Sequence, residues 1–260
     1  MLELEPVTGA LGAIARGVDL GSADESMAAD LRSALGRHLV LYFPDQELDR
    51  FQLSALGRLF GPPFLHPLVD NGFDDCPDVL ELRREPDETL MFGGASWHAD
   101  VTWLKPSGYL SILHAKTVPP VGGDTGFAST IACFEQLSSG LQDLLRGLKA
   151  VHSYFGPGAE EQARYLAMQP VVAKQLATGR EGLYVNRMFT TRFEGMTEPE
   201  SRPLLNYLFA QLERHEFTCR FRWQPGGTLM WDNRFTLHFP INDFSGQLRV
   251  MIRTTVLEPA

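Results

Sequence analysis

The 260-residue chain is poor in cysteine, and its three cysteines, Cys76, Cys133 and Cys219, lie far apart in the sequence. An odd number of widely spaced cysteines fits neither a disulfide framework nor a zinc site built from thiolates. Any metal site must therefore draw on the seven histidines and the carboxylates. Imidazole and carboxylate ligands favour an ion such as Fe(II) over a cysteine-rich zinc centre.

Clustered positive charge is also missing. The formal net charge is −9, and the 23 lysines and arginines form no basic run. Because phosphate binding needs a basic face, we expect no nucleic-acid partner. No apolar segment is long enough to span a bilayer, and residues 1–5 lack the basic and apolar stretches of a secretion signal. We therefore expect no membrane partner and a cytoplasmic location.

Nucleotide-binding motifs and a β-α-β alternation are absent too, which excludes a parallel Rossmann sheet. Helical periodicity is visible at Ser26–His38, Leu48–Phe60, Ile131–Gly147 and Pro199–His215. Strand-like segments are Leu39–Phe43, Gly108–Ala115, Gly182–Val185, Thr218–Trp223, Thr228–Trp231 and Leu248–Leu257. The sequence predicts a mainly β fold with flanking helices, arranged as an antiparallel barrel or sandwich.

A single domain spanning residues 1–260 is expected, because the composition is ordinary for a globular protein and no repeat or linker interrupts it. Residues 61–96 are rich in Pro, Gly and Asp, with a short strand candidate at Val79–Leu82. A second irregular stretch covers residues 153–167. Both are predicted to be loops near the functional site, where the first could act as a lid and the second could form part of the rim.

Two short segments carry the chemistry, His98-Ala99-Asp100 and a later His238. In a strand, residues two apart face the same way, so His98 and Asp100 would point together into a barrel. His238 would then come from a strand on the opposite side. Two imidazoles and one carboxylate on one face of an octahedral ion leave three positions open, as in non-heme Fe(II) oxygenases. Taken alone, an H-x-D pair is as readily a hydrogen-bonded core or surface pair.

The order of motifs decides between these readings. The chain contains, in turn, Trp97-His98-Ala99-Asp100-Val101-Thr102-Trp103, Gly122-Gly123-Asp124-Thr125, Val185-Asn186-Arg187, Trp231-Asp232-Asn233-Arg234 with His238, and Arg249-Val250-Met251-Ile252-Arg253. This order resembles the taurine dioxygenase (TauD/TfdA) family of Fe(II)/2-oxoglutarate-dependent dioxygenases, from about Gly12 to the C-terminus. The resemblance implies a double-stranded β-helix, or jelly roll, core.

The resemblance also implies that His98, Asp100 and His238 are the catalytic metal ligands, and that Fe(II), 2-oxoglutarate and O₂ are used. An intact Asp100 speaks against a halogenase, in which a small residue replaces this carboxylate. By the same resemblance Thr125 and Arg249 bind the far carboxylate of 2-oxoglutarate, and Trp231 packs beside the metal. The alternative for Arg249 is an exposed arginine in a surface ion pair.

For the substrate, Arg253 lies four residues after Arg249 on the same predicted strand, so both would point into the barrel mouth. In sulfonate-using members the matching arginine and a histidine, here His66, hold the anionic head; His66 alone would be an ordinary loop histidine. Val69 and Gly94 stand where taurine dioxygenase has an aromatic hydroxyl and an amide, so the slot is expected to be roomier and more apolar. Tyr154 is expected to line it.

The expected reaction is hydroxylation of an aliphatic C–H bond of a small anionic substrate (a sulfonate, sulfate ester or carboxylate), coupled to decarboxylation of 2-oxoglutarate to succinate and CO₂. The same fold could instead hydroxylate an amino acid or a natural-product intermediate. Two readings of another class stay open: a metal-dependent hydrolase that activates water with the same three ligands, and a non-catalytic jelly-roll binding protein. The sequence also leaves a dimeric or tetrameric homo-oligomer open.

Overall fold

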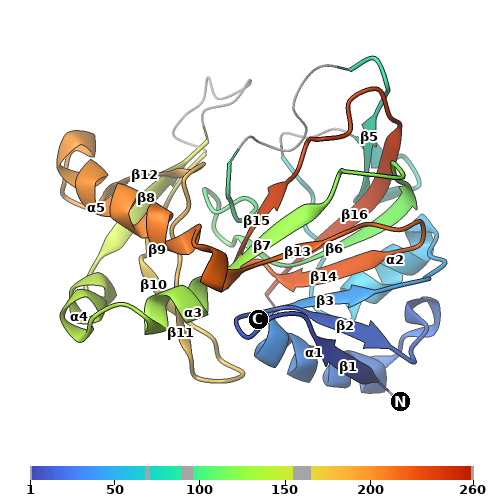
Figure 1. Cartoon of the computed structure of the whole chain (residues 1–260), viewed down its shortest axis with the longest axis horizontal. Helices are drawn as coiled ribbons and strands as arrows, with labels where there is room; N and C mark the ends of the chain where they lie inside the picture. Colours follow the sequence, from blue (N-terminus) through green and yellow to red (C-terminus); the bar gives the residue numbers. More distant parts are fainter. Residues whose placement is uncertain (1, 68–70, 89–95, 155–164, 259–260) are drawn as a thin grey trace.

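The computed structural model describes residues 2–67, 71–88, 96–154 and 165–258 (Figure 1). Eight strands form its largest sheet, in the spatial order β1 (Glu3–Pro6), β2 (Ala13–Arg16), β3 (Val40–Phe43), β14 (Thr228–Asp232), β6 (Gly108–Thr117), β16 (Arg249–Leu257), β5 (Cys76–Arg84) and β4 (Gly72–Phe73). Only the β2–β3 pair is parallel among the pairings described.

A smaller sheet of β13 (Thr218–Phe221), β7 (Thr125–Ser129) and β15 (Thr236–Pro240) lies over the middle of the large one (Figure 1). Phe127 of the small sheet packs edge-on against Trp231 of the large sheet, with ring centroids 5.4 Å apart. Leu229 and Met251 complete this buried layer between the sheets. The predicted mainly β fold with a jelly-roll core is confirmed.

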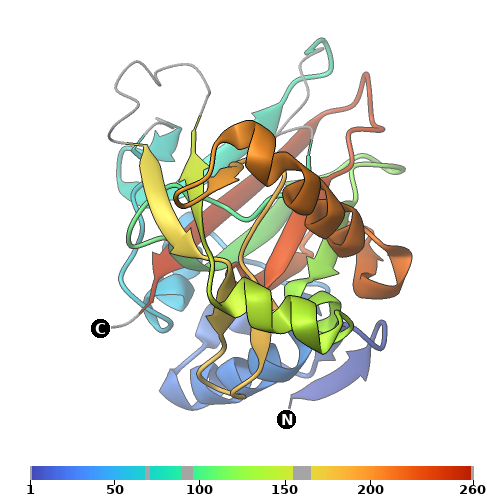
Figure 2. The same ribbon diagram turned by 90° about the vertical axis from the view of Figure 1, so that its left-hand side faces the viewer.

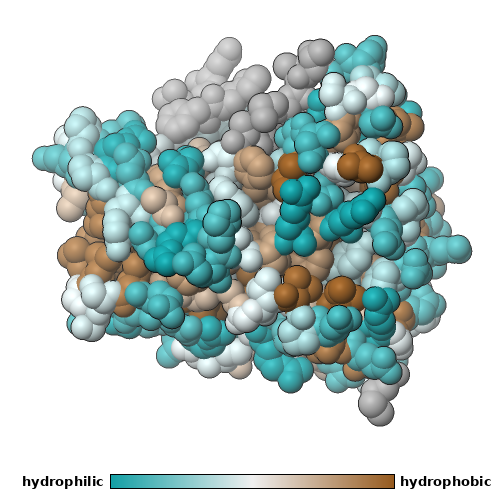
Figure 3. All heavy atoms as spheres, viewed as in Figure 1, coloured by the Kyte–Doolittle hydropathy of each residue, from teal (hydrophilic) through white to brown (hydrophobic). Residues whose placement is uncertain are grey.

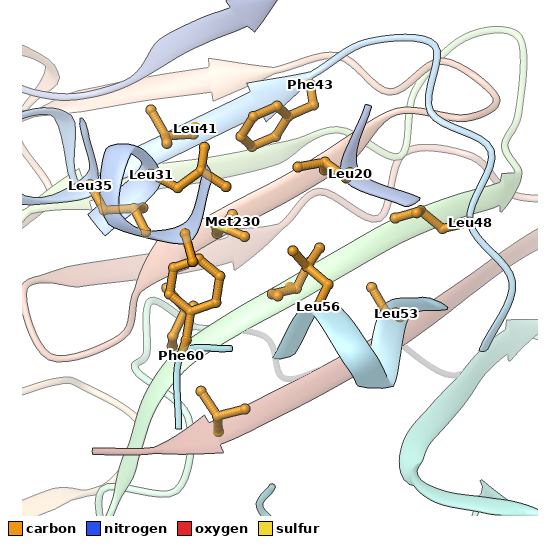
Figure 4. Close-up of a cluster of buried hydrophobic side chains, with 14 of the residues drawn as sticks. Leu20, Leu31, Leu35, Leu41, Phe43, Leu48, Leu53, Leu56, Phe60 and Met230 are labelled. Carbon is orange, nitrogen blue, oxygen red and sulfur yellow. The ribbon is translucent and has the colours of Figure 1, made fainter. Parts of the chain in front are cut away.

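The outer face of the large sheet is covered by α1 (Glu25–His38) and α2 (Arg50–Arg58), preceded by a short 3-10 turn, η1 (Leu20–Ser22). Both helices lie at the predicted positions, with α1 beginning one residue earlier and α2 two residues later than expected, where the side chains of Asp24 and Asp49 cap the first turns. Leucines from both helices pack with Phe43 and Met230 of the sheet (Figure 4). Because these helices cover one face of the sheet, the opposite face is the one that lines the cavity.

A second group of elements forms the other half of the molecule (Figures 1 and 2). It comprises α3 (Thr130–Glu135), α4 (Ser139–Arg146), β8 (Lys149–Ser153), β9 (Leu166–Pro170), β10 (Val172–Lys174), β11 (Glu181–Leu183), β12 (Thr190–Phe193), α5 (Glu198–Leu212) and η3 (His215–Phe217). The single helix predicted over Ile131–Gly147 is wrong. Ser138 adopts an extended backbone, and the Gln142 amide bonds the carbonyls of Phe134 and Leu137, so one helix ends and another begins.

The loop predicted over residues 61–96 is interrupted by the β4–β5 hairpin. Strand β5 runs nine residues and pairs with β16 from Arg84 opposite Arg249 to Val79 opposite Thr254. The short strand predicted at Val79–Leu82 lies within β5, and polar residues such as Glu81 and Arg83 on the other face hid its full length from a hydrophobic pattern. Of the stretch 153–167, Ser153 ends β8 and Leu166 begins β9. No helix among the described residues has the length and apolar character needed to cross a membrane.

Candidate active site

The two histidines of the predicted triad are adjacent strand partners. His98 forms an isolated antiparallel bridge with His238 of β15. The His98 N–H donates to the His238 carbonyl at 3.1 Å, and the His238 N–H donates to the His98 carbonyl at 2.7 Å. Their ring centroids are 4.1 Å apart. The expectation that these ligands come from opposite sides of a barrel is therefore wrong: they extend one sheet.

Asp100 lies in a turn, so the expectation that it shares a strand with His98 is also wrong. The side chain of Asn233 holds this turn from across the site. Its Oδ1 accepts from the Asp100 N–H at 2.9 Å, and its Nδ2 donates to the Asp100 carbonyl at 2.9 Å and to the Gly108 carbonyl at 3.2 Å. Val101 follows with a positive φ of 48°, which a β-branched residue rarely adopts. Fixed interactions thus direct the Asp100 carboxylate inward.

The triad has the geometry of a metal site. One ligand atom from each of His98, Asp100 and His238 lies within 4.8 Å of the others, and all three residues are buried. Asp100 Oδ1 is 3.9 Å from Nε2 of His98 and 3.8 Å from Nε2 of His238. Two nitrogens and a carboxylate oxygen converging in this way fit a ferrous ion with open positions.

The protonation states also suit metal binding. Burial lowers the pKa of both imidazoles, that of His238 to about 3. Burial alone would raise the pKa of Asp100, but Arg253 and the two histidines hold it well below its ordinary value. At neutral pH the site therefore presents neutral imidazoles and a carboxylate, the forms that act as ligands.

Contacts behind the triad orient its rings. The Ser96 carbonyl lies 2.9 Å from Nδ1 of His98, which leaves Nε2 facing the site. Trp231, predicted to pack beside the metal, lies with its ring 5.3 Å from that of His238. His238 Nδ1 is buried and finds no hydrogen-bond partner in the described part of the chain.

A cavity of about 390 Å³ opens on the triad. Its lining includes the predicted residues Thr125, Arg249, Trp231, His66, Arg253 and Tyr154 together with the three triad residues. Val69 and Gly94, also predicted to border the substrate, lie outside the described residues. The remaining lining is largely apolar and comprises Leu82, Val101, Trp103, Leu113, Met188, Phe189 and Pro240, with Asn71.

One end of the cavity holds a buried cation. Arg249 is 5% exposed, and no ion pair to it occurs within the described ranges. Burial, and then the nearby Arg84, lower its pKa to about 10, so it remains charged at neutral pH. Its Nε has no hydrogen-bond partner there. A buried guanidinium without a carboxylate is costly, so this end fits the far carboxylate of a dicarboxylic acid. Among the described residues, the surface ion pair considered as an alternative is not formed.

Thr125 and two glycines shape the same end. The indole N–H of Trp223 donates to Thr125 Oγ1 at 3.0 Å, which leaves the threonine hydroxyl proton for another acceptor. Gly123 has a positive φ of 71°, and a Cβ there would lie 3.5 Å from Arg249 Nε and 3.2 Å from the Phe244 ring. The glycine pair therefore allows a turn to pack closely on the buried arginine.

Arg253 lies next to the triad. Its Nη1 is 3.3 Å and 3.2 Å from the two oxygens of Asp100, a contact that sequence reasoning missed. Burial and the charge of Arg253 lower the pKa of His66 to about 4, and the His66 ring lies 6.1 Å from that of Trp103. The Arg253 guanidinium therefore faces both the Asp100 carboxylate and the neighbouring histidine.

A buried polar network supports the aromatic wall of the cavity. His152 is fully buried; its ring nitrogens lie 2.8 Å from Thr102 Oγ1 and 3.3 Å from Thr190 Oγ1. The Asn186 amide donates to the same Thr102 hydroxyl at 3.2 Å. Trp103 follows directly and packs against Tyr154 with ring centroids 5.2 Å apart. Trp103 could have been found from the sequence, because it stands in the same motif as His98. Nothing in the sequence indicated that Arg84 lies near the site.

Comparison with known proteins places this arrangement. Residues 3–255 match the family described as "Taurine catabolism dioxygenase TauD, TfdA family". The chain is 33% identical to an alkylsulfatase of Acinetobacter baylyi, over 98% of this chain and 84% of the relative. It is 32% identical to an α-ketoglutarate-dependent sulfate ester dioxygenase of Pseudomonas putida, over 98% of this chain and 89% of the relative.

A solved structure is also similar. The crystal structure titled as a putative α-ketoglutarate-dependent taurine dioxygenase from Burkholderia xenovorans aligns with a TM-score of 0.89 at 32% identity, covering all of this chain and 91% of the other. Sequence match, fold and site geometry agree: the chain belongs to the TauD, TfdA family of dioxygenases.

Proposed function

We propose that this dioxygenase uses Fe(II), 2-oxoglutarate and O₂ to hydroxylate an aliphatic C–H bond of an anionic substrate with an apolar body, a sulfate ester or sulfonate first of all. The observation that carries the proposal is Arg249, a buried cation lacking a carboxylate partner among the described residues, in the same cavity as the triad. A metal-dependent hydrolase would have no use for that cation. 2-Oxoglutarate fits it, since the acid can chelate a metal at one end and present a carboxylate at the other.

His98, Asp100 and His238 would hold the iron. When bound, ferrous iron with 2-oxoglutarate supplies the oxidising chemistry, in which O₂ converts the oxo acid to succinate and CO₂ and one oxygen atom enters the C–H bond. The chain's own residues orient and shelter the reactants. Arg249 and Thr125 anchor the far carboxylate, Trp231 packs on the His238 ring, and the buried apolar lining excludes water.

The substrate anion would be held near Arg253 and His66. Arg253 Nε is buried without a partner in the described chain, so it can donate to an anionic oxygen while Nη1 remains on Asp100. The body of the substrate would lie against Val101, Met188 and Phe189, which line the cavity beside the triad. Two of the relatives are named for sulfate ester chemistry, in agreement with this placement.

A carboxylate substrate is the second candidate, because a relative that is 30% identical, from Sphingobium herbicidovorans, is named as an (S)-phenoxypropionate dioxygenase.

If the carbon that is hydroxylated bears a sulfate ester, the product collapses to an aldehyde and releases sulfate. Hydroxylation next to an ether oxygen would similarly release an alcohol or phenol.

The test is succinate release under Fe(II), ascorbate and oxygen with hexyl sulfate, hexanesulfonate, phenoxypropionate and taurine, with His98→Ala as the blank. We expect the greatest turnover with hexyl sulfate, giving hexanal and sulfate in equal amounts. Sulfate release that continues without oxygen would indicate a hydrolase. If no compound exceeded the blank, and anaerobic Fe(II) with 2-oxoglutarate gave no visible charge-transfer band, the proposal would be wrong.

A further inference from the structure

We propose, on the basis of the function proposed above, that Arg84 is a positioning residue for the co-substrate: its charge, added to that of Arg249, makes the pocket select a 2-oxo acid with a second carboxylate. Arg84 lies directly opposite Arg249 where β5 pairs with β16. Directly paired residues in an antiparallel sheet project to the same face, so both side chains point to the cavity side. Arg84 is 7% exposed.

The two guanidinium groups share one aromatic ring. The Cζ atom of Arg84 lies 4.7 Å from the ring centroid of Phe244, and that of Arg249 lies 5.8 Å from it. The electron-rich face of a phenyl ring offsets part of the repulsion between two cations. It provides no negative charge, however, so the pair is incompletely compensated.

The partners of Arg84 are neutral. Its Nη1 donates to Asn242 Oδ1 at 3.2 Å and its Nη2 donates to the Glu88 carbonyl at 3.3 Å. No ion pair involves it or Arg249 within residues 2–67, 71–88, 96–154 and 165–258. After burial, the charge of Arg84 is the second cause that lowers the pKa of Arg249. A carboxylate bound at Arg249 would relieve this repulsion, and the binding free energy would include that relief.

The neighbouring arginine is a matched control. Arg83 faces the other side of β5, its side chain is 47% exposed, and it forms an ion pair with Glu85. Arg83 carries the same charge as Arg84 and lies on the same strand, but its side chain points away from the cavity. Substituting it tests the general effect of losing one positive charge from β5.

The experiment measures binding of two ligands to the anaerobic protein loaded with Mn(II), by titration calorimetry. One ligand is 2-oxoglutarate; the other is 2-oxovalerate, which has the same length and chelating group but a methyl in place of the far carboxylate. We expect Arg84→Gln to weaken 2-oxoglutarate binding about tenfold, a typical effect of one interacting charge, and to leave 2-oxovalerate within about twofold. Arg84→Lys should restore most of the affinity for 2-oxoglutarate, because lysine keeps the positive charge. The rescue should be incomplete, because lysine lacks the planar guanidinium that forms two hydrogen bonds. Arg83→Gln should resemble the wild type.

Equal losses for both ligands, or no rescue by Arg84→Lys, would show that Arg84 only holds the loops of Asn242 and Glu88, and would overturn the inference. Unchanged 2-oxoglutarate affinity in a folded Arg84→Gln protein would overturn it as well. Failure of the proposed function gives a different result, since the wild-type protein itself would then not bind 2-oxoglutarate.

Discussion

The two ends of the cavity are built by different means. At the proposed co-substrate end, Arg249 and Thr125 lie on strands, and backbone pairing along β16 and β7 sets where they point. At the proposed metal end, Asp100 lies in a turn, and one side chain, that of Asn233, bonds both the backbone N–H and the carbonyl of Asp100. Strand register spreads the control of a position over many backbone bonds, whereas the turn concentrates it in a single amide. Substitutions should therefore act locally at the first end and structurally at the second.

The largest effect is expected for Arg249→Gln at the strand-built end. Loss of one partner of a buried charge pair costs about 2–5 kcal/mol, so 2-oxoglutarate should bind on the order of 100-fold or more weakly. The protein without ligand should be no less stable than the wild type, because a buried uncompensated charge has been removed. Calorimetric titration and chemical denaturation check the two parts. A strong loss of stability would show that Arg249 holds the fold.

Asn233→Ala tests the turn-built end. The Asp100 N–H and the carbonyls of Asp100 and Gly108 lose their hydrogen-bond partner. We therefore expect the free energy of unfolding to fall by about 2–3 kcal/mol and the metal affinity to fall about 10- to 100-fold. Fe(II) or Mn(II) titration and denaturation measure these changes. Asn206→Ala, at an exposed position of α5, is the control and should change neither. Normal metal affinity in Asn233→Ala would mean that the turn holds its shape without the amide.

The apolar wall of the cavity includes Met188, which lies in a turn. Substituting this residue tests whether the wall contacts the body of the substrate. Met188→Ala should raise the KM for a six-carbon sulfate ester about tenfold, in line with the lost pocket contacts, and should change the KM for a two-carbon one little. Met196→Ala, a more exposed methionine, should leave both unchanged. Equal effects on both chain lengths would argue that the body of the substrate lies elsewhere.

The smallest effect is expected behind the strand-built end, at His114 of β6. Its ring bonds Thr228 at 2.9 Å, and burial, then Lys116, lower its pKa to about 4. The unfolded chain takes up this proton near pH 6.5, so folded stability should decline as the pH falls from 6.5 towards 4. Between pH 7 and pH 5, the free energy of unfolding of His114→Gln should fall by about 1.5–2 kcal/mol less than that of the wild type in denaturation experiments. Identical pH profiles would contradict this.

The same contrast explains what the sequence could predict. The mainly β class, the six strand segments and the approximate positions of α1 and α2 followed from the hydrophobic pattern, whereas the jelly roll followed from the resemblance to the family. The side chains facing the cavity from β16 followed from the two-residue period of a strand. The position of Asp100 did not, because it depends on a contact with Asn233 more than a hundred residues away in the chain.

Two other features could not be predicted for a related reason. The side-by-side arrangement of Arg84 and Arg249 exists only in the register between β5 and β16, and Arg84 lies beyond the end of the predicted strand Val79–Leu82. The contact between Arg253 and Asp100 joins a strand to a turn across the cavity. Sequence periodicity describes one segment at a time, so it is silent on how two segments meet.

The reciprocal backbone bonds between His98 and His238 have a consequence for the lifetime of the apoprotein. Two backbone hydrogen bonds join the residues that carry the imidazoles, so removal of the ion by a chelator should leave the two rings side by side. A stripped enzyme should keep two of its three anchoring points in place and regain metal without passing through an unfolded state. Anyone transplanting this centre into another scaffold would need to move the bridged pair as one piece and adjust only the carboxylate.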